Sequence, residues 1–119
     1  MIKALLIRSG NDAAIAIAEH IGGSVENFCQ MMNEKAKMMG LENTNFVTPH
    51  GLDNENHYST AYDLAKMAEY LLNIEYLANI VKERNVTIKI NENSRILGTT
   101  NEMLSIYEGS DGIKTGFTR

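Results

Sequence analysis

Two tripeptides near the ends of this 119-residue chain hold the side chains best suited to chemistry. Ser9-Gly10-Asn11 combines a hydroxyl, which accepts and donates a proton, with an amide that can hold two partners at once. Lys114-Thr115-Gly116 combines a cation and a hydroxyl, both suited to a carboxylate, with a glycine that lets a peptide backbone lie close. These residue types are suited to proton transfer and to holding a carboxylate-bearing peptide.

Each tripeptide also has a simpler structural interpretation. Ser9 or Asn11, placed just before Asp12, is ordinary capping chemistry for the N-terminus of a helix. Lysine, threonine and glycine also suit a surface strand that ends in a turn, with Thr115 facing away from its two neighbours. The functional interpretation therefore depends on the two tripeptides occurring together with matching neighbours.

Length and composition indicate one small domain with a modest core, since 44% of the residues are hydrophobic. The net charge of −4, with acids and bases interspersed, argues against nucleic-acid binding, which needs a basic patch. No apolar run approaches the roughly 18 residues that would span a bilayer. The first seven residues are too short for a signal peptide and lack a cleavage region, so no targeting signal is predicted in this chain.

The remaining reactive side chains favour structural roles. Cys29 lies in an apolar helical pattern and is predicted to be a buried small hydrophobe. The spacing of His20, His50 and His57 matches no zinc pattern, so no metal site is predicted; His20 suits a helix C-terminus and His50 a turn. Four methionines are expected to fill the core rather than form a binding surface, and they are Met31, Met32, Met38 and Met39.

Hydrophobic periodicity predicts five helices, at residues 2–7, 12–21, 25–39, 60–72 and 75–81. In the second helix one buried face is expected to hold Ala14, Ile15, Ala18 and Ile21. Ser24 is a predicted cap, and Thr60 with Asp63 forms a start similar to a capping box. Residues 41–58 are predicted to form a long irregular connection, of a length that tends to be functional or carefully tied down.

The pattern changes after Arg84, where alternating apolar residues predict a strand over 86–90. A second strand is expected at 95–97, a short turn or helix at 101–104, and the start of another strand at 113–118. That last strand would need partners on both sides, and the sequence offers two short ones. We therefore expect an α+β, mainly helical fold with an incomplete antiparallel sheet, in a chain truncated relative to its parent.

The neighbours of both tripeptides resemble the D-alanyl-D-alanine carboxypeptidases, which are the low-molecular-mass penicillin-binding proteins. Leu5-Leu6-Ile7-Arg8-Ser9-Gly10-Asn11-Asp12-Ala13-Ala14 is similar to the family's second motif region, although Arg8 stands where the family usually has proline. Asp111-Gly112-Ile113-Lys114-Thr115-Gly116-Phe117-Thr118 is similar to the third. Further matching segments lie at residues 18–21, 28–37, 40–46, 49–52, 57–65 and 101–104. The resemblance implies a β-lactamase/transpeptidase-like fold.

The family's nucleophile motif, Ser-x-x-Lys, has no counterpart in this chain. Three positions after its six serines stand Asp12, Asn27, Tyr62, Leu97, Glu108 and Ile113. We therefore expect residues 1–119 to be a partial carboxypeptidase catalytic domain, truncated at both ends and inactive by itself. Such a piece exposes core surface, so we also expect self-association or partial disorder.

The resemblance implies roles for three catalytic side chains. Ser9 would relay a proton to the leaving amine, and Asn11 would hold the motif lysine and the substrate's amide carbonyl. Lys114 would supply positive potential that favours the serine alkoxide and anchors the substrate carboxylate. The implied substrate-binding groups are the hydroxyl of Thr115, the open backbone at Gly116, and the N–H of Phe117 as one oxyanion donor.

The implied reaction removes the terminal D-alanine from a peptidoglycan stem peptide ending in D-Ala-D-Ala, by way of an acyl-serine that β-lactams would also form. The resemblance implies no metal and no organic cofactor. It implies a parent that acts outside the cytoplasmic membrane, secreted or membrane-associated, facing the cell wall.

Two other functions are compatible with this sequence. A class A β-lactamase shares the fold, but its second motif more often reads Ser-Asp-Asn and it needs a deacylating glutamate. A non-catalytic helical module that binds peptidoglycan or a protein partner would account for the missing nucleophile.

Overall fold

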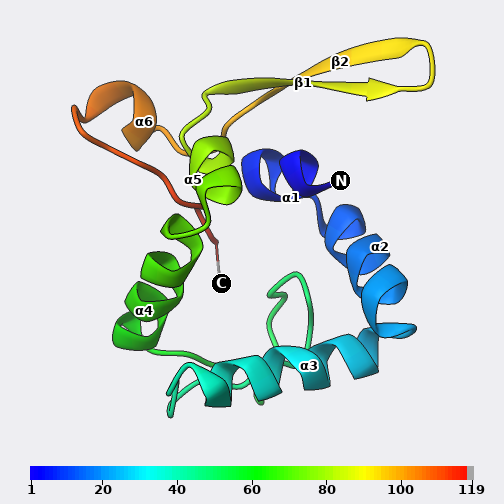
Figure 1. Cartoon of the computed structure of the whole chain (residues 1–119), viewed down its shortest axis with the longest axis vertical. Helices are drawn as coiled ribbons and strands as arrows, with labels where there is room; N and C mark the ends of the chain where they lie inside the picture. Colours follow the sequence, from blue (N-terminus) through cyan, green and yellow to red (C-terminus); the bar gives the residue numbers. More distant parts are fainter. Residues whose placement is uncertain (118–119) are drawn as a thin grey trace.

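The computed structural model describes residues 1–117, and of Ile90 the backbone alone. Helices and one two-stranded antiparallel sheet follow one another along the chain (Figure 1). Their bounds are α1 Ile2–Arg8, α2 Asn11–Gly22, α3 Val25–Met38, α4 Ala61–Leu72, α5 Glu75–Val81, β1 Asn85–Ile90, β2 Asn93–Gly98 and α6 Met103–Ile106. The predicted α+β class, mainly helical with a short antiparallel sheet, is confirmed.

The helices α1 to α5 follow one another around a ring, so that α1 meets α5 (Figure 1). A buried apolar cluster lies at this closure and joins Ile7 of α1, Ile80 of α5 and Val86 of β1. Leu6 and Leu97 pack against it. Full burial of an aliphatic side chain contributes roughly 1.5–3 kcal/mol, so this cluster holds the first helix against the region 80–97.

Local signals set the ends of the helices. The hydroxyls of Ser24 and Thr60 each accept a hydrogen bond from a backbone N–H three residues later, so both predicted caps are confirmed. Gly23 ends α2 in the left-handed region, at φ 75°. A Cβ on Gly22 would lie 2.7 Å from the backbone nitrogen of Phe28, so the bare glycine lets α2 and α3 approach closely.

The predicted irregular connection over residues 41–58 is confirmed, and side chains tie it to the helices. The amide of Asn33 on α3 donates to the carbonyl of Phe46 at 2.8 Å and accepts from its N–H at 2.7 Å. An antiparallel bridge pairs Asn45 with Tyr58 near the two ends of the loop. The loop is thus anchored through its backbone groups, as a long connection in a small domain requires.

Asp63 is the most deeply buried charged side chain described, with 1% of its surface exposed. Its carboxylate accepts from the N–H of Asn43 at 2.9 Å and from the hydroxyl of Thr44 at 2.8 Å. A capping box would instead turn this carboxylate back to the N–H of Thr60, so that half of the prediction is wrong. The loop supplies two donors inside a buried site, and the carboxylate bonds to them.

His57 holds the next part of the loop. Its Nδ1 accepts from the N–H groups of Val47 and Thr48 at 3.1 and 3.3 Å, and its ring meets Phe46 edge-on at 5.7 Å. Burial, and then the nearby charge of His50, lower the pKa of His57 below its ordinary value of 6.5. The ring therefore acts as a neutral acceptor.

The predicted helix faces are correct only in part. Ala14 and Ala18 are buried on α2, but Ile15 is exposed and Ile21 has 55% of its surface exposed. Cys29 is buried as predicted, and burial, with Glu26 as a smaller cause, raises the pKa of its thiol. The wrong predictions concern apolar residues at the edge of the helical stripe, because the neighbouring elements cover a narrower strip of the helix than the periodicity marks.

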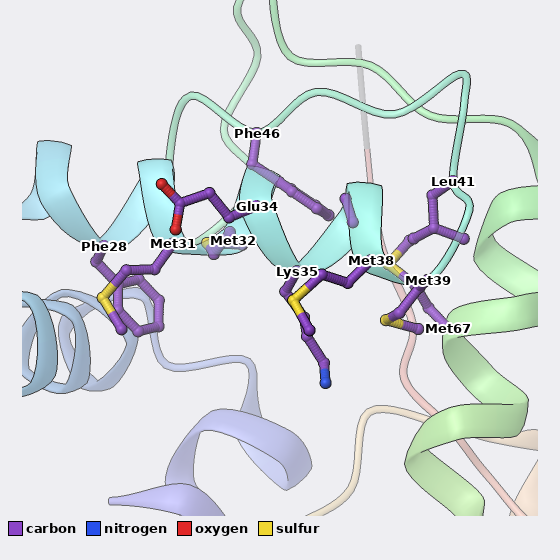
Figure 2. A pocket seen from close by; sticks show the side chains of 11 residues that line it. Phe28, Met31, Met32, Glu34, Lys35, Met38, Met39, Leu41, Phe46 and Met67 are labelled. Carbon is purple, nitrogen blue, oxygen red and sulfur yellow. The ribbon is translucent and has the colours of Figure 1, made fainter.

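The methionines of α3 do not all fill the core. Met38 has 81% of its surface exposed and Met31 is exposed too, so for these two the prediction is wrong. They line an open apolar hollow of about 550 Å³ along α3, where Figure 2 shows them with Lys35 on the same helix and Phe46 on the loop. Met31 and Met38 lie two helical turns apart, on a side of α3 that stays open to solvent.

The two strands predicted at 86–90 and 95–97 are confirmed; they pair as an antiparallel hairpin, with Val86 opposite Leu97 in the register of β1 and β2. The strand predicted at 113–118 is wrong for residues 113–117, which are not assigned to a strand, and Thr118 lies outside the described residues. A strand is defined by its backbone partners, and the described hairpin does not pair with this segment.

Replacing Asp63 by alanine should lower the free energy of unfolding by about 1–3 kcal/mol, because the N–H of Asn43 and the hydroxyl of Thr44 would lose their acceptor. Urea unfolding followed by circular dichroism measures the change. The exposed Glu69 on the same helix is the control, and Glu69→Ala should cost far less. Equal losses in the two variants would contradict a specific role for Asp63.

Stability should fall as the pH drops below about 6.5. The folded chain holds His57 with a lowered pKa, so the unfolded chain binds more protons in this range and is favoured. The expected result is a thermal midpoint that decreases from pH 7 towards pH 5. In His57→Asn, where an amide oxygen replaces Nδ1 without titrating, the decrease should be smaller. If the thermal midpoint of His57→Asn decreases as much as that of the parent, other titrating groups cause the decrease.

Candidate active site

Ser9 lies in the sharp turn between α1 and α2. It adopts the left-handed conformation at φ 57° and ψ 40°, and its N–H donates to the carbonyls of Ala4 and Leu5 in α1. Gly10, in an extended conformation, is the N-cap of α2 and makes no side-chain cap bond. The capping interpretation of Ser9 and Asn11 is therefore wrong. Non-glycine residues adopt this conformation rarely, and such residues concentrate at functional sites.

Lys114 reaches Ser9 across 105 positions of sequence. Its amine donates a hydrogen bond to the Ser9 hydroxyl and another to the carbonyl of Thr115 at 3.0 Å. Although the side chain as a whole is exposed, burial around the amine lowers the pKa of Lys114 from its ordinary value of 10.5. A cation that loses its proton more readily, beside a hydroxyl, is suited to proton transfer.

The hydroxyl of Thr115 forms a second contact, with the Thr100 hydroxyl at 2.6 Å. The tripeptide patterns did not predict Thr100, because it lies outside both and the signal that identifies it is spatial. Beyond Thr115 the backbone is open: a Cβ on Gly116 would meet no atom within 4 Å, and Phe117 has 88% of its surface exposed.

The structure thus brings Ser9, Lys114 and Thr115 together from opposite ends of the chain. Asn11 stands two positions after Ser9, as the first residue of α2, with an exposed side chain. The hydroxyls and the cation that meet at this corner can relay a proton and hold an anionic peptide end. In the described part of the chain no group of three or more His, Cys, Asp or Glu could hold a metal ion.

The end of α5 positions the segment that carries Lys114. Gly112, at φ 124°, passes so close to this helix that a Cβ on it would lie 3.1 Å from side-chain and backbone atoms of Val81. Lys82 and Asp111 add an exposed ion pair at 3.3 Å. Because Val81 follows Ile80 of the apolar cluster, the same cluster that fixes α1 also fixes the approach to Lys114.

The model of one protein family, described as D-alanyl-D-alanine carboxypeptidase, matches residues 1–119. The chain belongs to this family. Among curated members of this carboxypeptidase family, the chain is 45% identical over 119 residues to D-alanyl-D-alanine carboxypeptidase DacF of Bacillus subtilis. It is 40% identical over 118 residues to DacA of Haemophilus influenzae. The alignments cover 99% and 98% of this chain but 31% and 29% of those proteins.

Solved structures agree with the carboxypeptidase assignment. The D-alanyl-D-alanine carboxypeptidase of Mycobacterium tuberculosis superposes with a TM-score of 0.90 at 33% identity, over 98% of this chain and 44% of that one. Penicillin-binding protein 5 of Haemophilus influenzae superposes with a TM-score of 0.86 at 39% identity, over 98% of this chain and 33% of that one. The predicted family and fold are thereby confirmed. No described helix of this family member has the length and apolar character to cross a membrane.

Replacing Gly112 by alanine should lower the free energy of unfolding by about 1–3 kcal/mol, since a Cβ meets Val81 in a backbone conformation that strains other residues. Urea unfolding measures this. Gly116→Ala is the matched control, because its Cβ meets open space, and it should leave stability within about 0.5 kcal/mol. Similar losses for both variants would show that Gly112 is not specifically required.

Proposed function

We propose that this chain supplies the proton-relay and substrate-clamping part of a serine-type D-Ala-D-Ala carboxypeptidase. Residues 1–119 form part of the catalytic domain, and the attacking serine comes from sequence that this chain does not contain. The protein removes the terminal D-alanine from peptidoglycan stem peptides, binds β-lactams at the same serine, and acts outside the cytoplasmic membrane. Family membership over the whole chain supports this proposal.

The observation that carries the proposal is the hydrogen bond from Lys114 to Ser9. Residues 105 positions apart meet in one contact, and each belongs to one of the two tripeptides. Neither a capping serine nor a surface lysine requires such a contact. A shared role in moving a proton accounts for it.

In the acylation step the serine oxygen attacks the carbonyl carbon of the D-Ala-D-Ala bond, and the C–N bond breaks. Ser9 passes the proton that the serine loses to the departing amine, and Lys114 stabilises the negative charge near this hydroxyl. The amide of Asn11 holds the substrate's carbonyl. Water then attacks the acyl-serine, which releases the shortened peptide and restores the serine.

Groups on residues 114–117 hold the substrate. The hydroxyl of Thr115 and the Lys114 cation receive the terminal carboxylate of the peptide. The open side of Gly116 supports this role, since a peptide can lie along the backbone there. The N–H of Phe117 donates to the developing oxyanion, an interaction worth roughly 2.7–4 kcal/mol in comparable sites.

A chimera tests the proposal, with the 119 residues replacing the matching segment of the Bacillus subtilis carboxypeptidase. It should release D-alanine from a peptide ending in D-Ala-D-Ala and form a covalent adduct with fluorescent penicillin. Ser9→Ala and Lys114→Ala should each lower kcat by roughly 10²–10⁴-fold, because a positioned acid–base group is lost. Colorimetric D-alanine release measures the rate.

The control variant is Glu19→Gln on the exposed surface of α2, which should keep the parent rate. The 119-residue chain alone should release no D-alanine. Full activity in Ser9→Ala and Lys114→Ala would sink the catalytic assignment. A folded chimera that binds peptidoglycan without turnover would support the non-catalytic module instead.

A further inference from the structure

We propose that Thr100 is a positioning residue, which orients the hydroxyl of Thr115 towards the terminal carboxylate of the substrate. The inference rests on the proposed function, because it takes Thr115 as the carboxylate-binding group. It adds a residue from outside both tripeptides and makes carboxylate selectivity depend on a pair of hydroxyls. The geometry behind it is the 2.6 Å distance between the two hydroxyl oxygens.

A fixed turn between β2 and α6 holds Thr100 in place. On one side, the N–H of Thr99 donates to the carbonyl of Arg84 at 2.8 Å. On the other side Asn101 is buried, its N–H donates to the Thr99 hydroxyl at 3.1 Å, and its side-chain oxygen accepts from the N–H of Met103 at 3.1 Å. Both neighbours of Thr100 are thus anchored, so its hydroxyl is presented from a defined backbone position.

Thr115 is held by its backbone as well as by its side chain. The amine of Lys114 donates to its carbonyl at 3.0 Å, while the Thr100 hydroxyl lies against its own hydroxyl. A β-branched side chain has few χ1 rotamers, so one hydrogen bond to the hydroxyl is enough to select among them. The Thr115 hydroxyl then has a defined direction beside a cation.

The number of protons on the two hydroxyls decides which threonine is the donor in the bond between them. Each hydroxyl carries one proton, and one proton lies between two oxygens at 2.6 Å. A carboxylate only accepts, so Thr115 must give its own proton to the substrate. Thr100 must therefore be the donor to Thr115 in the complex, and a hydroxyl that accepts one hydrogen bond becomes a better donor in the next.

The test uses the Bacillus subtilis chimera with Thr100→Val, Thr100→Ser and Thr115→Val. Two substrates are compared, a peptide ending in D-Ala-D-Ala and the same peptide with a terminal carboxamide. For the carboxylate substrate Thr100→Val should raise KM by about 3- to 10-fold, the size of one neutral hydrogen bond, with kcat changed less. Thr100→Ser should restore KM, and Thr100→Val should not change KM for the carboxamide.

The double variant separates positioning from general damage. When Thr115 is already valine, Thr100→Val should cause no further rise in KM for the carboxylate substrate. The reason is that Thr100 acts only through the Thr115 hydroxyl, which the double variant lacks. An equal rise in KM for both substrates would overturn the inference, since it would show a structural effect. If KM rises in Thr115→Val but not in Thr100→Val, the role of Thr100 is overturned and the proposed function still stands. A folded chimera without turnover would overturn both the role of Thr100 and the proposed function.

A second measurement uses the same chimera and does not depend on turnover. Three-bond couplings from the Thr115 methyl carbon to its backbone nitrogen and carbonyl carbon report the χ1 rotamer by NMR. One rotamer is expected in the parent chain and in Thr100→Ser, and rotamer averaging in Thr100→Val. A single unchanged rotamer in Thr100→Val would overturn the inference whatever the kinetic measurements show.

Discussion

The arrangement of this molecule depends on the apolar contact that joins Ile7, Ile80 and Val86. Ser9 follows Ile7 by two positions, and Val81, the neighbour of Ile80, supports Gly112 two positions before Lys114. One cluster therefore sets both halves of the candidate site. This cluster closes the ring of helices in Figure 1, and without it the two ends of the chain would not be held together.

The polar contacts of the site are too weak to assemble it. The bonds from Lys114 to Ser9 and between Thr100 and Thr115 lie where water competes for each partner. A hydrogen bond of this kind contributes about 0.5–1.5 kcal/mol to stability. The backbone must therefore be placed first, by the left-handed turn at Ser9 and by the close passage of Gly112, and the side-chain contacts then select rotamers.

Polar residues away from the site stabilise the long connection between α3 and α4. Asn33, His57 and Asp63 each accept hydrogen bonds from backbone N–H groups of the loop. These side chains take the place of the backbone partners that a helix or a sheet would provide. His57 shows why residue type alone does not identify a metal site. A histidine in a loop is also a neutral acceptor, and its surroundings decide between the two roles.

Local physics made much of the fold predictable from sequence. The 3.6-residue period marked α1 to α5, the period of two marked β1, and Ser24 and Thr60 marked helix starts, because these signals act over a few neighbouring residues. The same period could not say which side of α3 would be covered, so Met31 and Met38 were misassigned. The strand over residues 113–117 was misassigned too, since pairing depends on distant partners.

For the candidate site, the sequence by itself determined the chemical groups and, through their neighbours, the family. Residue types and spacing carry that information directly, so Ser9, Asn11 and Lys114 could be named without coordinates. Only the tertiary structure decided that Lys114 touches Ser9 and that Thr100 touches Thr115. Such contacts depend on how the ring of helices closes, which is a property of apolar packing between segments far apart in sequence.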